Sequence, residues 1–98
     1  MAIFKPCADS VFFKSANPQD QRLGNLVSQD ESTAKSKTYF IAGYPDDEGI
    51  SINGGRPGAA HAPDQIRKFF YKMTPSAWAL EIPHIVDMGN LITSIPLI

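Results

Sequence analysis

The fold of this chain is decided by the stretch Gly43-Tyr44-Pro45-Asp46-Asp47-Glu48-Gly49-Ile50-Ser51-Ile52-Asn53-Gly54-Gly55-Arg56-Pro57-Gly58-Ala59. An apolar run leads into this loop, and an amphipathic helical pattern follows it. A strand that delivers a long Gly-rich loop onto a helix is where open α/β sheets build ligand sites. The sequence therefore predicts an α/β fold whose polar chemistry is concentrated between residues 43 and 59.

The residues on either side of the loop predict a βαβ unit. Residues 38–44 are almost continuously apolar, which suits a strand of a parallel sheet covered on both faces. Pro63 and Asp64 suit the first turn of a helix, and Thr74-Pro75 suits its end. Residues 84–89 form the second predicted strand. One apolar helix stripe is expected to face the sheet: Ile66, Phe69, Phe70 and Met73, with Arg67, Lys68 and Lys72 lying off it.

The chain divides into two predicted parts. Residues 1–37 are expected to be a lead-in, with a short helix at 18–27 capped by Asn17 and a polar linker at 28–37. Residues 38–98 are expected to hold the βαβ unit. Two parallel strands and one helix leave the faces and edges of a sheet uncovered. We therefore expect either the opening part of a larger α/β domain or a chain that pairs with something else.

Composition excludes several classes of protein. The 98 residues carry a net charge of -1, which gives no electrostatic case for nucleic-acid binding, where a basic patch or stripe is expected. No apolar run reaches the length of a membrane span, and the first residues do not form a secretory signal. Cys7 is the single cysteine, which makes a reducing, cytoplasmic setting the default and an internal disulfide impossible. Most lone cysteines are inert, so Cys7 is not expected to be a nucleophile.

Several interpretations of the loop remain open on composition alone. Gly54, Gly55 and Gly58 would serve equally well in tight turns without any ligand. Phosphate binding before a helix N-terminus lacks the glycine spacing of the known fingerprints. Metal binding by residues 46–48 lacks the alternate ligand spacing of a calcium loop. His61 and His84 each stand alone, without a second histidine or carboxylate at ligand spacing.

The longer string GYPDDEGISINGGRPGAAHAPDQIRKFFYKMTP is more specific than these pieces. It resembles the first strand, loop and helix of the ureohydrolase superfamily (arginase, agmatinase and formimidoylglutamase), and most of all the formimidoylglutamase branch. The flanking residues 17–24 and 86–90 agree with the same branch, so the resemblance covers most of residues 11–91. One departure is Ala62, where the family usually has glycine.

The resemblance implies a three-layer αβα fold around a parallel sheet, of which this chain would be the N-terminal βαβ portion. It also implies hydrolysis of a C–N bond in a formimino or amidino substrate by two manganese ions. The family's metal ligands come from motifs of the GGDHS, DAHxD and DxDxxDP kinds, which this sequence lacks. We therefore assign no catalytic and no metal-binding residue to this chain and expect it to be inactive alone.

What the chain could supply is the rim of such a site. A substrate with a carboxylate and a formimino group suits Arg56, whose guanidinium can hold a carboxylate with two hydrogen bonds. Asn53 offers an amide, and Gly54 and Gly55 permit close backbone approach. An alternative is that Arg56 only pins the loop to Asp46 or Asp47, and that Arg67 pairs with loop acids.

Two hypotheses of different classes follow. The first is the N-terminal segment of a formimidoylglutamase-like, manganese-dependent hydrolase, partnered by the remainder of its domain. The second is a non-catalytic binding or assembly module that keeps the βαβ unit and hides its open sheet edge by self-association.

Overall fold

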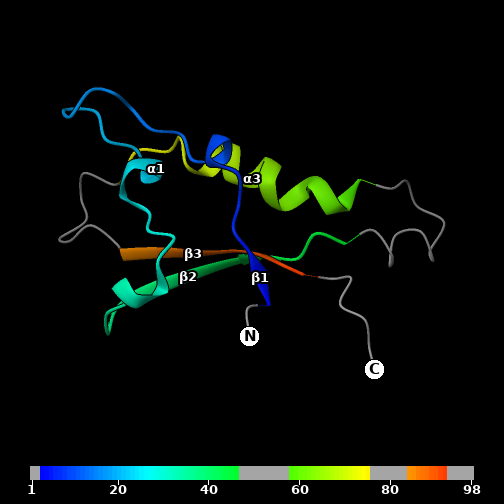
Figure 1. Cartoon of the computed structure of the whole chain (residues 1–98). Coiled ribbons are helices and arrows are strands. Elements are labelled where there is room, and N and C mark those ends of the chain that lie inside the picture. Colours follow the sequence, from blue (N-terminus) through cyan, green and yellow to red (C-terminus); the bar gives the residue numbers. More distant parts are fainter. Residues whose placement is uncertain (1–2, 47–57, 76–83, 93–98) are drawn as a thin grey trace.

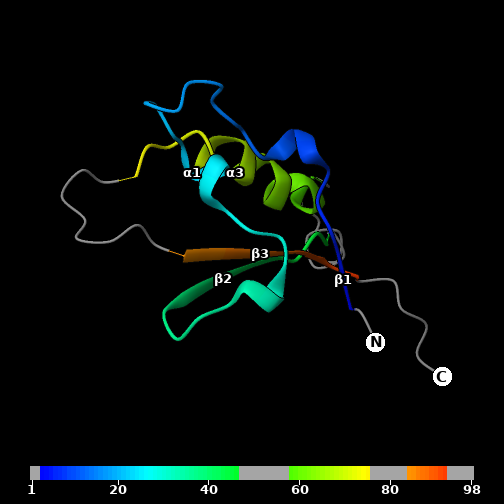
Figure 2. The same cartoon turned by 60° about the vertical axis from the view of Figure 1, so that its left-hand side comes forward.

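The computed structural model describes residues 3–46, 58–75 and 84–92 (Figure 1). The three strands are β1 (Phe4–Lys5), β2 (Thr38–Gly43) and β3 (His84–Leu91). The α-helices are α1 (Leu23–Leu26) and α3 (Ala62–Phe70). Three short 3-10 turns complete the elements: η1 (Asp9–Val11), η2 (Glu31–Thr33) and η3 (Ala59–His61). The described residues form a small α/β unit, with α1, α3 and η1 on the same side of the sheet in both views (Figures 1 and 2).

The sheet has the strand order β1-β3-β2, with β3 in the centre. β2 and β3 run parallel, in a register from Thr38 opposite His84 to Gly43 opposite Asn90, which confirms the predicted βαβ pairing. β1 lies antiparallel against the end of β3, and a bridge from Ser28 pairs with the middle of β3. The sheet is therefore mixed rather than purely parallel, because N-terminal residues satisfy the second edge of β3.

The prediction that β2 is covered on both faces is wrong. Tyr39 is 68% exposed and Phe40 is also exposed, on opposite faces of the strand. Within the described residues β2 is an edge strand, and α1 and α3 both lie on the same side of the sheet (Figure 2). A continuously apolar sequence indicates that both faces of a strand are suited to burial, but it does not identify the elements that cover those faces.

Helix α3 begins as predicted, with Pro63 in its first turn, but its orientation differs from the prediction. Its buried side holds Arg67 and Tyr71, whereas Ile66, Phe69 and Met73 of the predicted stripe are exposed. The helix also ends at Phe70, before Thr74-Pro75. The orientation follows from polar partners on β3, described below, that hold Arg67 against the sheet.

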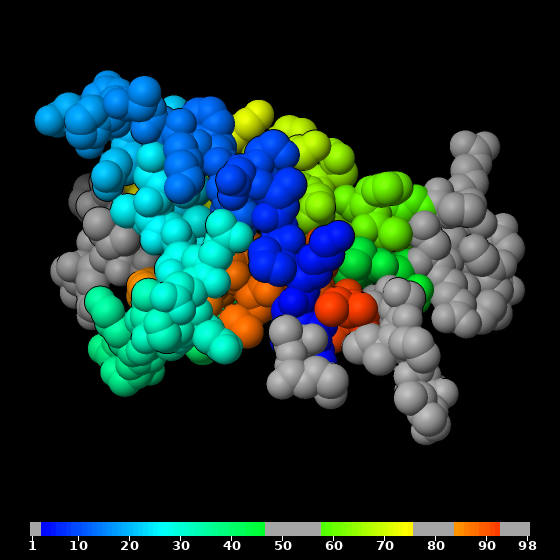
Figure 3. All heavy atoms as spheres, in the orientation of Figure 1, coloured from blue at the N-terminus to red at the C-terminus, as the bar shows by residue number. Residues whose placement is uncertain are grey.

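The N-terminal segment takes part in the core. Val11 and Phe12 of this segment form a buried cluster with Tyr71, and Cys7 and Leu23 pack against it. In the space-filling view the N-terminal residues (blue) lie against the end of β3 (orange to red) (Figure 3). The segment thus supplies part of the packing around α3, and the division of the chain at residue 37 stays a prediction.

The predicted helix at 18–27 is wrong in extent. Asn17 accepts a hydrogen bond from the backbone N–H of Gln19 through its Oδ1 atom (3.0 Å), which closes a turn. The helix forms only over Leu23–Leu26. Asn25 replaces Asn17 as the local cap, since its Oδ1 accepts from the backbone N–H of Arg22 at 3.0 Å. In the parts of the chain that the structure describes, no helix has the length and apolarity needed to cross a bilayer.

Candidate functional site

The carboxyl ends of the parallel strands β2 and β3 lie beside the start of α3 (Figure 1). The loop that joins β2 to α3 begins at this end of the sheet. The approach is closest at Gly43: a Cβ atom there would lie 2.1 Å from Asn90 Oδ1 and 2.8 Å from Pro63 Cβ. Only glycine fits such a contact, so Gly43 allows the three elements to converge.

Arg67 connects these elements through every N–H of its guanidinium. Nε donates to Asp87 Oδ2 at 2.9 Å, and Nη2 donates to Asp87 Oδ1 at 3.0 Å and to the carbonyl oxygen of Gly89 at 2.9 Å. Nη1 donates to Asp64 Oδ1 at 3.2 Å and to Asn90 Oδ1. All five donors are therefore used, although the residue is only 3% exposed. Burial opposes the charge of Arg67, and the ion pair with Asp87 outweighs that effect and raises its pKa.

Asp87 is the acceptor at the centre of this arrangement. Besides Arg67, it accepts from the Tyr71 hydroxyl at Oδ2 and from the backbone N–H of Gly89 at Oδ1 (2.9 Å). The carboxylate is 2% exposed and all of its acceptor positions are occupied. Burial raises the pKa of the fully buried Tyr71 well above its ordinary value, and the hydrogen bond to Asp87 raises it further.

Asp64 and Asn90 form the solvent-facing side of the cluster. Asn90 Nδ2 donates to Asp64 Oδ1 at 3.2 Å, and the side chain of Asp64 is partly exposed.

Burial raises the pKa of the nearby Cys7 thiol to about 11, and the charges of Asp87 and Asp64 add to this against the opposing charge of Arg67. The raised pKa favours the neutral thiol of Cys7 over the nucleophilic thiolate, which agrees with the expectation that Cys7 is not a nucleophile.

We call Asp64, Arg67, Tyr71, Asp87 and Asn90 the Arg67 cluster. No guanidinium N–H is left to contact a ligand, so the cluster supports the edge of the sheet rather than binding a substrate. Among the described residues, no buried side-chain nitrogen or oxygen lacks a hydrogen-bond partner. The cluster fixes the start of α3 against the end of β3, and Gly43 at the end of β2 packs against it.

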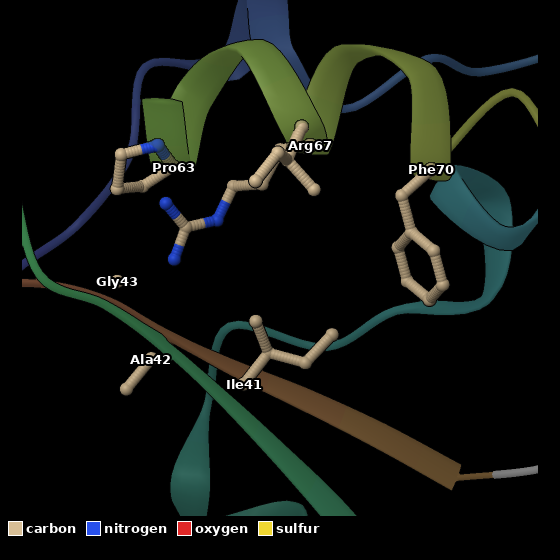
Figure 4. Close-up of a pocket in the computed structure, with 7 residues that line it drawn as sticks. Ile41, Ala42, Gly43, Pro63, Arg67 and Phe70 are labelled. Atoms are coloured by element: carbon tan, nitrogen blue, oxygen red, sulfur yellow. The ribbon is translucent and has the colours of Figure 1, made fainter. Parts of the chain in front are cut away.

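An apolar cavity of about 240 Å³ lies beside the cluster, between β2 and α3 (Figure 4). Ile41 of β2 and Phe70 of α3 point into the space between the two elements. Its lining is almost entirely carbon, and Arg67, the charged residue in it, is held by the cluster. The lining consists of Ile41, Ala42, Gly43, Pro63, Ile66, Arg67 and Phe70.

The predicted rim residues Asn53, Gly54, Gly55 and Arg56 lie outside the described residues, as do Asp47 and Glu48. The structure describes only the flanks of the loop, up to Asp46 and from Gly58. The alternative in which Arg67 pairs with loop acids is not what the described residues show: Arg67 pairs with Asp64 of its own helix and with Asp87 of β3. The role of Asp87 was not predicted from the sequence, although a carboxylate in the middle of an apolar strand indicates a buried partner of opposite charge.

The two histidines do not form a metal site in the described part of the chain. His84 Nε2 lies 3.3 Å from Thr33 Oγ1, and His61 is exposed in η3. Within residues 3–46, 58–75 and 84–92, no three histidine, cysteine or carboxylate side chains gather closely enough to hold a metal ion. The described residues therefore do not fit a manganese centre.

Comparison with known proteins places the chain beside one enzyme family. It is 33% identical over 82 residues to a formimidoylglutamase of Salmonella heidelberg (strain SL476), a match that covers 81% of this chain and 25% of that protein. A formimidoylglutamase of Salmonella arizonae is 35% identical over 79 residues, covering 78% of this chain and 24% of the relative. The resemblance to the formimidoylglutamase branch of the ureohydrolases is thus confirmed as a partial match, and the chain spans about a quarter of the length of these relatives. No family model matches the chain, and no solved structure matches it.

Proposed function

We propose that the chain provides the first strand, loop and helix of a formimidoylglutamase-like hydrolase, which cleaves a C–N bond in a formimino substrate. The observation that carries the proposal is the match to proteins named formimidoylglutamase across about four-fifths of this chain. The described part, with β2 leading through the loop to α3 and β3, agrees in element order with the unit expected from the resemblance.

The role proposed for the chain is one side of the substrate site. Ligands of open α/β sheets bind at the carboxyl ends of the strands, and the loop after β2 leaves from that edge. We assign substrate contact to Asn53, Gly54, Gly55 and Arg56, with Arg56 holding a substrate carboxylate. The Arg67 cluster would hold the second flank of this loop in place, since it joins the start of α3 to the end of β3. Gly43, at the end of β2, packs against Asn90 of the cluster and so places the first flank beside it.

The catalytic manganese ions of the family would be held by residues outside those described here, since the described residues do not fit such a centre. No step through the metals is assigned to this chain. When bound, two manganese ions supply Lewis-acid activation and a hydroxide nucleophile. The contribution of this chain is substrate orientation, and the 98-residue chain alone is proposed to be inactive.

Two experiments test the proposal. The purified chain, assayed with Mn²⁺ for formamide release from formiminoglutamate, should show no turnover above a metal blank, and clear turnover would show that it carries its own ligands. A chimera in which this chain replaces the matched quarter of the Salmonella heidelberg relative should retain activity. In that chimera Arg56→Ala should raise KM by about 10- to 100-fold through loss of a charged hydrogen bond, whereas Lys68→Ala, on the exposed side of α3, should not. Equal KM values for both variants would remove the role assigned to Arg56.

A further inference from the structure

Strand β3 carries a bulge close to its carboxyl end. Asp87 lies opposite Ile41 of β2. Three residues further on, Asn90 lies opposite Gly43, which is only two residues further along β2. One extra residue on one strand of a pair is the mark of a β-bulge, and a glycine with positive φ often completes it. Gly89 has that conformation, with φ at 87°, and a Cβ atom on it would lie 2.2 Å from a carbonyl oxygen of β1. The bulge therefore depends on glycine at this position.

The bulge decides where the side chain of Asn90 points. Side chains alternate along a regular strand, so Asp87 and Asn90, which are three residues apart, would face opposite sides of the sheet. In this structure both face α3, since each accepts a hydrogen bond from Arg67. The extra residue thus turns Asn90 to the side of the sheet on which the helix lies, and redirecting a side chain is a known use of bulges.

Turned in this way, Asn90 contacts both elements that the loop connects. Its Oδ1 atom lies so close to Gly43, the last residue of β2, that a Cβ atom there would be 2.1 Å away. The same Oδ1 accepts from Arg67 Nη1, and Nδ2 donates to Asp64 Oδ1 at 3.2 Å in the first turn of α3. One side chain therefore joins the strand that the loop leaves to the helix that it enters.

We infer that Asn90 is a positioning residue for the substrate site: it fixes the separation of the two flanks of the loop after β2. The geometry rests on the contacts above, and the consequence for catalysis rests on the proposed function, in which Arg56 of that loop holds a substrate carboxylate. A misplacement of about 1 Å in a group that orients a substrate can cost about a hundredfold in rate. Because the loop is assigned to binding, loss of Asn90 should raise KM and leave kcat nearly unchanged.

An amide is the side chain that suits the two polar contacts of Asn90. The guanidinium of Arg67 offers only donors, and the ionised carboxylate of Asp64 offers only acceptors. Asn90 meets both, with Oδ1 turned to the guanidinium and Nδ2 turned to the carboxylate. Aspartate at this position would keep the acceptor for Arg67, whereas leucine would keep the branched outline and lose both contacts. These two replacements separate the polar contacts of Asn90 from the space that it fills.

The first test uses the chimera with the Salmonella heidelberg relative. Asn90→Leu should raise KM for formiminoglutamate by about tenfold and leave kcat within about twofold, and Asn90→Asp should bring KM back to within about threefold of the parent chimera. Val11→Ala removes buried methyl groups that pack against Tyr71 at the other end of α3, so it should lower stability without changing KM. An unchanged KM in Asn90→Leu, in a chimera where Arg56→Ala raises KM, would overturn the inference and leave the proposed function intact.

The second test needs no activity and uses the 98-residue chain. Amide hydrogen exchange, followed by NMR, compares the backbone N–H groups of Asp46 and His61 on the two flanks with that of Gly24, and the three donate to backbone carbonyls at 3.1, 3.0 and 3.0 Å. Asn90→Leu should accelerate exchange at Asp46 and His61 by about threefold or more relative to Gly24, because the flanks open locally. Equal acceleration at all three would mean that Asn90 only stabilises the unit as a whole, and would overturn the inference. An inactive chimera would remove the proposed hydrolase, and the exchange pattern would still decide whether Asn90 holds the two flanks.

Discussion

Arg67 and Asp87, 20 residues apart, form a two-pronged ion pair that fastens α3 to the central strand β3. Nε and Nη2 of Arg67 reach the two carboxylate oxygens of Asp87 at 2.9 and 3.0 Å, and both side chains are almost completely buried. Taking two charges out of water is costly, and the cost is offset only when every donor and acceptor is satisfied. Here the remaining positions are filled by Tyr71, Gly89, Asp64 and Asn90.

Asp87→Asn should therefore destabilise the fold strongly. The substitution removes the negative charge and turns one acceptor into a donor that faces Arg67 or Tyr71, so it leaves a buried guanidinium without its counter-charge. We expect the free energy of unfolding to fall by about 3–5 kcal/mol, measured by urea titration with circular dichroism. Asp20→Asn removes a carboxylate from the solvated pair with Arg22 and should leave the urea midpoint unchanged. Equal urea midpoints for the two variants would show that the buried Arg67–Asp87 pair contributes no more to stability than the solvated Arg22–Asp20 pair.

Tyr71→Phe should separate the contribution of the Tyr71 hydroxyl to stability from that of its ring. The ring contacts with Phe12 and Phe70, at centroid distances of 5.0 and 5.2 Å, would remain. The hydrogen bond to the buried carboxylate of Asp87 would be lost. Hydrogen bonds to charged groups contribute about 1.5–3 kcal/mol, and a loss of that size is expected in urea unfolding near neutral pH. Tyr44→Phe, at an exposed tyrosine, is the matched control.

The same variant should change how stability depends on alkaline pH. The pKa of Tyr71 is raised on folding, so the folded protein keeps a proton that the unfolded chain releases near pH ~10. The stability from this group is complete below that pH and falls as the pH rises above it, by up to ~1.4 kcal/mol per pH unit. The difference in unfolding free energy between the wild type and Tyr71→Phe should therefore shrink above pH ~10. A difference that stays constant across that range would contradict a buried, protonated phenol.

Cys7 should react slowly with thiol reagents. Burial raises the pKa of its thiol from 9.0 to about 11, which leaves about a hundredfold less thiolate near neutral pH. Alkylation by iodoacetamide should be slower by about that factor than for the same chain in urea, where the thiol is solvated. Similar rates in the folded and unfolded chain would mean that the N-terminal segment does not pack against the Arg67 cluster.

The local elements of the fold could be predicted from the sequence. β2 and β3 are marked by β-branched and aromatic runs, and the start of α3 by Pro63, because these signals lie within a few residues of the element they specify. The parallel pairing of β2 with β3 follows from a strand-helix-strand order. What could not be predicted was the side of α3 that faces the sheet. The apolar stripe of Ile66, Phe69 and Met73 dominates the pattern, but Arg67 is the residue with a partner across the interface.

The contribution of the N-terminal segment to the core could not be predicted from the sequence for a related reason. Val11 and Phe12 form a patch too short to specify an element, and their burial depends on Tyr71, about 60 residues away. The Arg67 cluster likewise joins side chains that are separated along the chain, so single-sequence spacing gives only weak hints of it. The rim residues 53–56 are predicted from the resemblance alone, and they lie outside the described residues.

Gly43→Ala should disturb the edge of the sheet where the loop begins. The added methyl group would stand 2.1 Å from Asn90 Oδ1 and 2.8 Å from Pro63 Cβ, so Asn90 would have to leave its contacts with Arg67 and Asp64. Overpacking of this kind costs about 1–3 kcal/mol, and urea unfolding should show a loss in that range. Ala42→Val adds methyl groups at the exposed neighbouring position of β2 and should have little effect. If Gly43→Ala were as stable as the wild type, the ends of β2 and β3 and the start of α3 would not converge as tightly as the structure has them.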